Sequence, residues 1–361
     1  MQKYCGIGLM SGTSLDGLDM VCCNFYVGNE ETTYHIEAFR EIPYGKEWRE
    51  KLSGAFYLDA TQLNQLDKEY GIFLGKKVKQ FCQEHHLTPD FVASHGHTVF
   101  HRPEEKISLQ IGSGSEIANE SGFTTVNNFR MADVLKGGQG APLVPIGDQM
   151  LFGEYDFCLN IGGISNVSFN RHGKRIAYDI APANMVLNHL ASKAGYDYDQ
   201  DGKIAASGQV NQSLCNTLDS LPFFKQPFPK SLGREWVEGY YLPIVESAPL
   251  SLSDQLATCT YQIGRQITHE LNDFPTGKIL ITGGGAYNQT LINTIRQHSH
   301  HHIVIPDSVT VSMKEALVFA YLGLRRLRGE VNCLASVTGA TSDTCSGDVY
   351  QPRPKYLSNN I

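Results

Sequence analysis

The chain has 361 residues, of which 41% are hydrophobic and 19% are charged, and its formal net charge is -7. This length exceeds one typical core, so we expect two domains, and the composition is that of a globular protein. The negative charge gives no reason to expect nucleic acid or an anionic membrane surface as a partner.

Targeting and redox signals point to one compartment. No apolar run approaches the length of a transmembrane helix, and the first residues lead into a strand rather than an apolar leader. The nine cysteines are scattered, their number is odd, and no C-x-x-C motif occurs. We therefore expect reduced thiols and a cytoplasmic protein.

The first part of the chain predicts three strands, a long helix and several shorter elements. The short connections between the three strands predict an antiparallel meander. Apolar residues from Leu63 to Cys82 recur at helical spacing, which predicts one buried helix face. In order, we expect strands at 4–10, 20–27 and 34–42, a helix at 60–86, strands at 91–94 and 107–111, a helix at 115–121 and a strand at 123–126.

The turn between the first two strands is rich in Gly, Ser and Thr. Small side chains leave its backbone N–H groups open, and successive N–H groups of a tight turn form a concave anion site. The same residues are common in plain hairpin turns, which is the alternative. The stretch 127–148 has no periodicity and many Gly and Pro residues, so we expect a functional loop between domains or a linker.

The opening pattern then recurs in the second part of the chain. A helix at 182–194 is expected to hold Pro182 in its first turn. The other expected elements are strands at 157–161, 167–170 and 174–178, a helix at 253–271, a strand at 278–282, a glycine turn at 283–288 opening a helix at 289, a strand at 302–305 and a helix at 313–328. Two α/β halves of this kind, facing each other, would place both glycine turns at a shared cleft that suits a nucleotide.

Four stretches, in order, resemble the 1,6-anhydro-N-acetylmuramic acid kinase family of the actin, sugar kinase and Hsp70 ATPase superfamily. They are residues 8–17, 137–145, 159–166 and 283–288, and the match runs from Gly6 to about Tyr350. Several multi-residue motifs in the right order are specific, whereas one glycine motif is not.

The resemblance implies an α/β, two-lobed actin-like (RNase H-like) ATPase fold. Each lobe would be a mixed sheet flanked by helices, with the active site in the cleft between lobes. Residues 1–129 and about 340–361 would form one lobe, and residues 130–339 the other. The implied reaction phosphorylates O6 of the anhydro-sugar with ATP while water opens the bridge at C1, giving N-acetylmuramic acid 6-phosphate. Its setting would be cell-wall recycling, and homodimerisation is a family expectation.

Asp179 is the expected base by family position. It lies at the end of a predicted strand, just before the helix expected at Pro182, where a helix N-terminus would stabilise its ionised form. The alternative from the residues alone is a helix cap. Family members commonly read Asp-Thr-Gly-Pro-Gly-Asn, and this chain differs from them at Ile180, Ala181 and Ala183 while keeping Asp179, Pro182 and Asn184.

The expected nucleotide contacts fall on three turns. The first turn and the start of the next strand would meet the phosphates, with Mg²⁺ bridging phosphate oxygens and keeping several waters, so we expect no dedicated metal cluster. The expected residues are Gly12, Thr13, Ser14, Leu15, Asp16, Gly17, Leu18 and Asp19 for that turn, Gly162, Gly163 and Asn166 for the second, and Gly283, Gly284, Gly285 and Asn288 for the adenosine. Asp16 is either an outer-shell partner of Mg²⁺ or a plain turn aspartate.

The sugar is expected to meet His97, Thr98, Arg130 and Asn184. Arginine offers a bidentate fork for the lactyl carboxylate of the sugar, and a surface ion pair is the alternative reading of Arg130. The family usually has Gln where His97 stands. His298, His300, His301 and His302 look like metal ligands, but without Cys or carboxylate spacing a solvated loop is favoured.

Glu315 has two readings. Ser312 to Glu315 fits a capping box at the start of the last helix, which we favour, and a catalytic role near the attacking water is the second reading by family position. Two functions compete with the main one: a kinase for an anhydro-sugar without the lactyl group, such as levoglucosan, and a non-catalytic nucleotide or sugar sensor. An esterase or protease has no support, since no G-x-S-x-G motif occurs.

Overall fold

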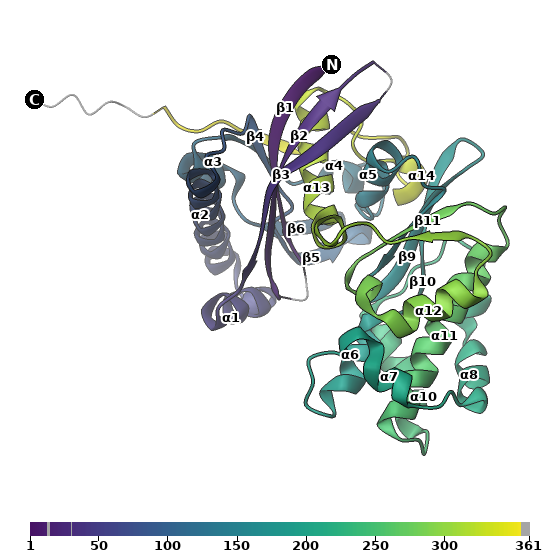
Figure 1. Cartoon of the computed structure of the whole chain (residues 1–361). Helices are drawn as coiled ribbons and strands as arrows, with labels where there is room; N and C mark the ends of the chain where they lie inside the picture. Colours follow the sequence, from purple (N-terminus) through teal and green to yellow (C-terminus); the bar gives the residue numbers. More distant parts are fainter. Residues whose placement is uncertain (13–14, 30, 355–361) are drawn as a thin grey trace, which may run out of the picture. The chain divides into compact units, whose positions relative to one another are not determined.

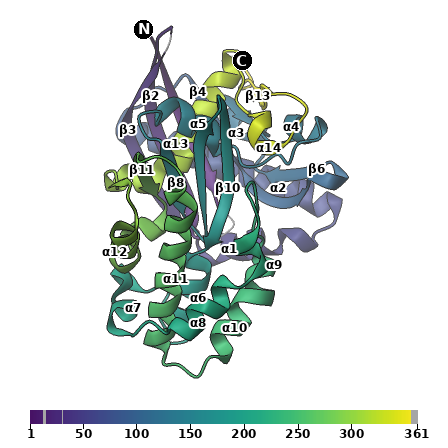
Figure 2. The ribbon, with the colours of Figure 1, turned by 90° about the vertical axis from the view of Figure 1, so that its right-hand side faces the viewer.

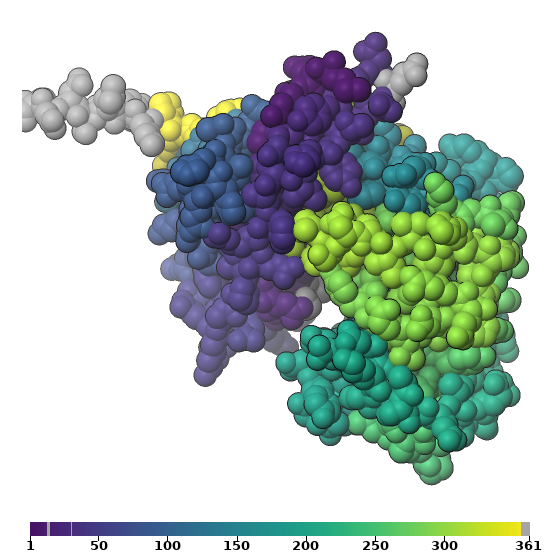
Figure 3. All heavy atoms as spheres, viewed as in Figure 1, coloured from purple at the N-terminus to yellow at the C-terminus, as the bar shows by residue number. Residues whose placement is uncertain are grey.

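The computed structural model describes residues 1–12, 15–29 and 31–354. The chain forms two compact units (Figure 1). The first unit holds Met1–Leu151 together with Met313–Ile361, and the second holds Phe152–Ser312. In Figure 3 the yellow atoms of the C-terminal part lie against the blue atoms of the first unit, so the chain returns to the unit in which it began.

This division differs from the expected boundaries at 129/130 and near 340. Helix α13 (Ser308–Leu327) belongs to the first unit from Met313 onward. A Cβ atom built on Gly8 would lie 1.9 Å from the carbonyl oxygen of Ala316, and one on Gly147 would lie 2.5 Å from Val318. Because these backbones pack so closely, both the stretch after 129 and the last long helix stay with the N-terminal residues.

The first unit is built on a six-stranded sheet in the order β13-β7-β4-β1-β2-β3. The first three strands form the expected antiparallel meander, and β4 and β7 continue the sheet in parallel with β1. Its strands are β1 (Gln2–Ser11), β2 (Gly17–Val27), β3 (Thr32–Pro43), β4 (Phe91–Ser94), β7 (Thr124–Asn127) and β13 (Asp348–Tyr350), beside a separate hairpin of β5 (His97–Arg102) and β6 (Ile107–Ile111).

The helices cover both faces of this sheet. Along β1, Ile7 and Leu9 point into the core shared with the long helix, while Gly8 points to the other face and lets α13 approach. The helices are α1 (Lys46–Gly54), α2 (Ala60–His85), α3 (Gly114–Ser121), α4 (Met131–Leu135), α5 (Val144–Leu151), α14 (Ala335–Thr338) and most of α13, with the short turns η1 (Ala55–Tyr57) and η2 (Pro103–Glu105). Asp59 caps α2 through the N–H groups of Thr61 and Gln62, both at 2.9 Å.

The second unit repeats the plan with a five-stranded sheet in the order β10-β9-β8-β11-β12. Again three strands form an antiparallel meander, and two further strands are parallel to the first of them. The strands are β8 (Phe157–Ile161), β9 (Ile164–Arg171), β10 (Lys174–Pro182), β11 (Lys278–Thr282) and β12 (His302–Val304). The expected repeat of architecture is therefore confirmed.

Helices surround this second sheet, and α11 contributes much of the core (Figure 2). Its buried residues Leu256, Ile263 and Ile267 pack in one cluster with the strands. The helices are α6 (Asn184–Ser192), α7 (Lys203–Ser207), α8 (Gln212–Asp219), α9 (Arg234–Trp236), α10 (Leu242–Ser247), α11 (Leu252–Asn272) and α12 (Gln289–His298), with the short turns η3 (Gln200–Gly202), η4 (Pro222–Lys225), η5 (Val237–Tyr241) and η6 (Gly284–Tyr287).

Two local predictions were wrong. Pro182 is the last residue of β10, not part of a helix, because the third strand of the meander continues to pair with β9 as far as Pro182. The stretch 127–148 is not a plain loop either: it holds α4 and the start of α5. Four of the residues of α5, Pro145 to Asp148, are buried, so packing makes a helix where Gly and Pro hide the periodicity.

Candidate active site

The turn between β1 and β2 is the first predicted phosphate contact. Thr13 and Ser14 lie outside the described residues. The N–H of Leu15, which has a φ of 61°, donates to the carbonyl of Gly12 at 3.4 Å. The carbonyl of Asp16 accepts from the N–H of Tyr44 at 3.1 Å, while its side chain is exposed. The turn is thus tied to the end of β3 and leaves one carboxylate in solvent.

Gly17, Leu18 and Asp19 begin β2: Leu18 and Asp19 pair with both β1 and β3, and Gly17 pairs with Pro43 of β3. Leu18 is buried in the core, so only the start of the predicted run is free of the sheet. Asp19 pairs in register with Glu41 of β3. Burial raises the pKa of Asp19 to about 7, and the negative charges of Glu41, Glu315 and Asp16 add to the shift.

This group of carboxyls suits a hydrated cation. Like charges held close together repel, and a divalent cation relieves that repulsion. Among the described residues, no three His, Cys, Asp or Glu side chains come together in a direct metal cluster. The carboxyl chemistry around Asp19 therefore fits an Mg²⁺ ion that keeps most of its waters, rather than one enclosed by protein ligands.

Glu315 does not cap a helix, contrary to the reading favoured above. Helix α13 begins at Ser308, and Asp307 caps it by accepting from the N–H of Thr310 at 3.0 Å. Glu315 lies inside the helix, where burial raises the pKa of its carboxyl while the positive charges of Lys314 and Arg130 lower it. The neighbouring ion pair of Lys314 with Asp148, at 2.7 Å, is buried.

Arg130 is not a surface ion pair. Its Nη1 donates to the carbonyl of Gly140 at 2.8 Å, and its Nη2 donates to Nε2 of His95 at 2.7 Å. Since a guanidinium only donates, Nε2 of His95 accepts, and the ring proton sits on Nδ1, 3.0 Å from the carbonyl of Gly96. Burial lowers the pKa of Arg130 to about 10, against the opposing effect of Glu315. Arg130 is held as a fixed cation near a carboxylate.

His97 opens β5 and is buried, with Thr98 beside it on the same strand. Its Nδ1 lies 3.5 Å from Oγ of Ser11 at the end of β1. The hydroxyl of Tyr44 donates to Ser11 at 2.8 Å and contacts the hydroxyl of Tyr70 at 2.5 Å. Burial lowers the pKa of His97, so a neutral ring joins this chain of hydroxyl groups.

The second unit brings two of the predicted glycine turns together. The strands β8 and β11 are parallel neighbours, so the turns that follow them meet at one edge of the sheet. Gly283 has a φ of 82°, and a Cβ there would lie 2.6 Å from Oδ1 of Asn160. A Cβ on Gly285 would lie 2.2 Å from Cγ2 of Ile161. Glycine is required at both positions to let the turns approach.

Asn184 lies between these turns. Its backbone N–H donates to the carbonyl of Gly162 at 3.0 Å, and its side chain donates to the carbonyl of Ile161 at 3.3 Å. A Cβ on Gly284 would lie 3.4 Å from its amide nitrogen. Asn288, expected at the adenosine, caps α12 through the N–H of Leu291 at 3.0 Å. The structure thus groups Asn184 with the expected nucleotide turns of the second unit.

Asp179 lies on β10 and pairs in register with Asn166 of β9. It caps no helix: α6 begins at Asn184 after Ala183, which makes no side-chain cap. Burial raises the pKa of Asp179, so the expected stabilisation of its charge by a helix N-terminus was wrong. Hydrogen bonds from Ser231 at 3.1 Å and from the N–H of Leu232 at 2.8 Å lower that pKa in part.

Ser231 and Leu232 were missed by reasoning from the sequence. They come from the irregular stretch between η4 and α9, 52 and 53 residues after Asp179. No periodicity or spacing connects two such distant segments. A Lys-Ser pair within a Pro-containing loop was the only visible signal, and it is weak.

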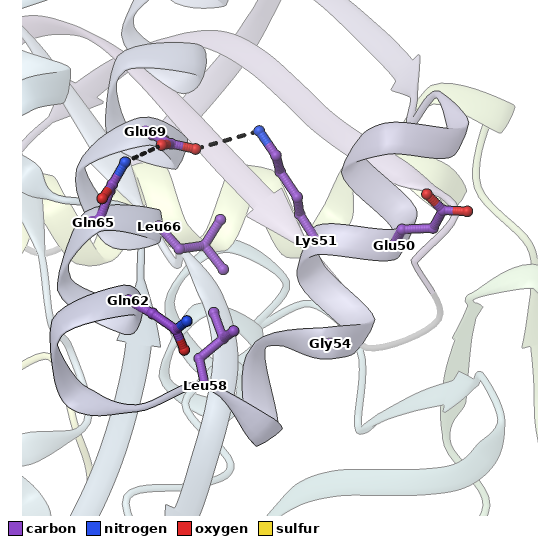
Figure 4. Close-up of a pocket in the computed structure, with 8 residues that line it drawn as sticks. All are labelled: Glu50, Lys51, Gly54, Leu58, Gln62, Gln65, Leu66 and Glu69. Atoms are coloured by element: carbon purple, nitrogen blue, oxygen red, sulfur yellow. Dashed lines mark hydrogen bonds and ion pairs between the residues drawn. The ribbon is translucent and has the colours of Figure 1, made fainter.

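A pocket of about 290 Å³ lies between α1 and α2 (Figure 4). In the figure Lys51 extends toward Glu69, which also contacts Gln65. The lining residues are Glu50, Lys51, Gly54, Leu58, Gln62, Gln65, Leu66 and Glu69. None of the predicted site residues lines it.

In the histidine run near residue 300, His300 and His302 are exposed, while His301 has a structural role. His301 is buried, its Nε2 lies 2.8 Å from the carbonyl of Leu271, and its ring packs edge-on against Phe157. In the part of the chain that the structure describes, no helix is both long enough and apolar enough to cross a membrane.

The two sheets repeat one mixed α/β plan, and in the second sheet the glycine turns follow two parallel strands. Residues 3–352 match the family described as "Anhydro-N-acetylmuramic acid kinase". The chain belongs to the anhydro-N-acetylmuramic acid kinase family, and it is therefore a kinase by class.

Two curated relatives carry that name. The protein of Hydrogenovibrio crunogenus is 35% identical over 96% of this chain and 98% of its own length, and that of Aliivibrio fischeri is 33% identical over 97% and 99%. A ROK family glucokinase of Streptomyces griseus, solved with glucose and AMPPNP, aligns with a TM-score of 0.39 and 11% identity over 88% of this chain and 98% of its own.

Proposed function

We propose that this chain uses ATP to convert 1,6-anhydro-N-acetylmuramic acid and water to N-acetylmuramic acid 6-phosphate, in the recycling of cell-wall fragments. The observation that carries the proposal is family membership over residues 3–352. The fixed carboxyl of Asp179 supports it, because the reaction needs a base for water.

Asp179 would act as the general base. Water attacks C1 of the sugar and gives its proton to this carboxylate, the bond from C1 to O6 breaks, and O6 takes the γ-phosphoryl group of ATP. Burial raises the pKa of Asp179, which makes its ionised form a stronger base than an exposed aspartate. Glu315, buried in α13, is our second catalytic candidate in the first unit.

The phosphates of ATP would be bound by backbone N–H groups of the first turn and of Gly162 and Gly163, with Asn166 beside them. The adenosine would lie on Gly283 to Gly285. Mg²⁺, held through waters near Asp19 and Asp16, supplies charge neutralisation for the phosphates when bound.

Arg130 would bind the lactyl carboxylate, with His97, Thr98 and Asn184 as further sugar contacts. The fixed guanidinium supports this role, since its orientation is set by Gly140 and His95 before any ligand arrives. Arg130→Lys should raise the KM for the carboxylate-bearing sugar roughly tenfold and leave the KM for levoglucosan, if that is a substrate, within twofold. Equal losses for both sugars would contradict the assignment.

A mass-spectrometric assay with ATP and Mg²⁺ tests the whole proposal. The parent protein should convert the sugar to a product heavier by one phosphate and one water. Asp179→Asn should lower the rate by about a thousandfold while ATP still binds, because it keeps the shape and removes the base. Unchanged sugar with the parent protein would instead favour another anhydro-sugar or the sensor reading. A homodimer and a cytoplasmic location are part of the proposal, and sedimentation velocity tests the first.

A further inference from the structure

Three hydrogen bonds join Asp179 to the loop between η4 and α9, residues 226–233. The backbone N–H of Asp179 donates to the carbonyl of Lys230 at 3.0 Å. Its Oδ2 accepts from the hydroxyl of Ser231 at 3.1 Å and from the N–H of Leu232 at 2.8 Å. Among the described residues, no hydrogen bond reaches Oδ1. The two carboxylate oxygens are therefore unequal.

We propose that Ser231 is a positioning residue for Asp179, and that its hydroxyl commits Oδ2 to the loop so that Oδ1 is the atom that takes the proton from water. The inference rests on the proposed function, since it names the working atom of the proposed base. A carboxylate fixed at one oxygen presents the other in one direction, which a near-attack geometry requires.

An ion pair between Lys230 and Glu270 attaches this loop to α11. Lys230 is buried, its Nζ pairs with Glu270 of α11, and it lies 4.9 Å from the centre of the Phe223 ring. The other oxygen of Glu270 accepts from the hydroxyl of Tyr178 at 3.3 Å. Because Tyr178 precedes Asp179 on β10, the anchor holds the loop and the strand to the same helix.

The electrostatic setting of Asp179 is simple. The charged groups near the loop and near Tyr178, the neighbour of Asp179 on β10, are Lys230 on the loop, Glu270 on α11, Asp273 just after α11 and Arg171 on β9. Lys230 and Glu270 neutralise each other, and Arg171 lies over the ring of Phe228. Burial raises the pKa of Asp179, and only the bonds from Ser231 and Leu232 lower it. Loss of the serine hydroxyl should therefore raise the pKa further.

In the proposed step the proton of the attacking water passes to Oδ1. The electron pair of the broken O–H bond stays on the oxygen that bonds to C1, and the pair of the C1–O6 bond leaves with O6. O6 attacks the γ-phosphorus of ATP, whose bond to the β,γ-bridging oxygen breaks, and that electron pair leaves with ADP. The products are the sugar 6-phosphate, ADP and a protonated Asp179, so atoms and charge balance. Ser231 takes no part in the bond changes, and its hydroxyl donates to the base.

The test compares Ser231→Ala, Ser231→Thr and a control, Ser247→Ala, in full pH profiles of kcat and KM. Ser231 is exposed, so its variants should fold. Ser247 also lies in the second unit, and its hydroxyl donates to a backbone carbonyl, that of Ile244 at 3.0 Å. We expect Ser231→Ala to lower kcat roughly tenfold near pH 6, with KM within twofold, and to move the acid limb of the kcat profile to higher pH.

Ser231→Thr should restore the parent profile, since it keeps the hydroxyl, and Ser247→Ala should match the parent throughout. An acid limb that does not move in Ser231→Ala, or a threonine variant as poor as the alanine variant, would overturn the proposal. The parent enzyme separates the two levels: if it makes no product, the proposed function fails. If it makes product and Ser231→Ala is unchanged, only the role of Ser231 fails.

Discussion

The two units carry different side chains at equivalent positions of their meanders, where the second strand pairs with the third. Counted from the turn after the first strand, the third residue of β2 is Asp19, which pairs with Glu41 of β3. The third residue of β9 is Asn166, which pairs with Asp179 of β10. In the second unit the register shifts between Asp179 and Ala181, so one extra residue bulges next to the aspartate.

The difference lies in charge. Directly paired residues of antiparallel strands lie on one face with close Cβ atoms. Burial raises the pKa of Asp19 to about 7, and repulsion from the paired Glu41 adds to the shift. Asp179 faces an amide instead, and burial alone raises its pKa. One scaffold therefore carries a pair of facing carboxyls in one unit and a single carboxyl opposite an amide in the other.

Asn166→Asp would erase this difference in the second unit. A carboxylate opposite Asp179 would raise the pKa of both groups and place a negative charge near the phosphate turn. We expect kcat/KM at pH 7 to fall about a hundredfold, with partial recovery at higher pH, in steady-state assays.

Asn170→Asp is the matched control, because it adds a carboxyl to the same strand at an exposed position beside Arg175. Its kcat/KM should stay within threefold of the parent. If Asn166→Asp and the control have the same activity, the amide opposite Asp179 does not matter for the base.

Asp19→Asn makes the reverse change in the first unit. With the pair reduced to one carboxylate, the attraction for a cation near the phosphate turn weakens. We expect the Mg²⁺ concentration at half-maximal rate to rise roughly tenfold, while the affinity for nucleotide without metal improves slightly. Titration of the rate with Mg²⁺ measures the first effect. Glu47→Gln, on the exposed face of α1, should leave the Mg²⁺ dependence unchanged.

The same carboxyl predicts how stability depends on pH. The pKa of Asp19 is about 7 in the folded protein, whereas the ordinary value of 3.8 applies to the unfolded chain. Between these two pH values the folded protein therefore binds one proton more than the unfolded chain. The contribution of Asp19 to stability is full below pH 4 and is lost as pH rises to about 7. Between pH 5 and pH 8, Asp19→Asn should therefore flatten a decline of roughly 2 kcal/mol in the free energy of unfolding. Equal slopes for variant and parent in urea titrations would contradict the raised pKa.

The sequence could predict what depends on local pattern. Apolar runs and short connections located the strands of both meanders, and the helical spacing of apolar residues along 60–86 located α2, which ends one residue earlier. Glu315 was misread because Ser312 to Glu315 fits a cap, while the residue that caps the helix, Asp307, precedes it by eight positions. Burial of α13 against β1 overrode the local signal, and only the fold reveals that packing.

The environment of Asp179 was out of reach for another reason. Its position could be inferred from the family motif, but its hydrogen-bond donors stand on a loop more than fifty residues later. Burial of Asp179 sets the direction of its pKa shift, and the helix after β10 does not. Long-range contacts of an irregular loop leave no periodic trace in the sequence. Neither the hydrogen bonds from this loop to Asp179 nor their effect on its pKa could therefore be predicted.

Tyr70→Phe tests the smallest part of the comparison, namely how the first turn is supported. The hydroxyl of Tyr44 donates to Ser11 and contacts the hydroxyl of Tyr70. In the second unit, the hydroxyl of Ser165 next to its turn donates to the carbonyl of Ala181 and accepts from the N–H of Ala181. Phenylalanine keeps the shape of the buried ring, so no cavity forms. The loss of one hydroxyl contact should lower the free energy of unfolding by about 1 kcal/mol, with kcat within twofold.

Urea unfolding measures this effect, and Tyr57→Phe, at a residue 85% exposed, is the control that should change nothing. A loss of 3 kcal/mol or more, well above the roughly 1 kcal/mol of one hydrogen bond, would mean that Tyr70 organises the wider chain of hydroxyls to His97. No loss at all would mean that Tyr44 and Ser11 hold the end of β1 without help. A loss of about 1 kcal/mol would fit support of the end of β1 by side-chain hydroxyls in the first unit. The equivalent turn of the second unit is supported by bonds to the backbone instead.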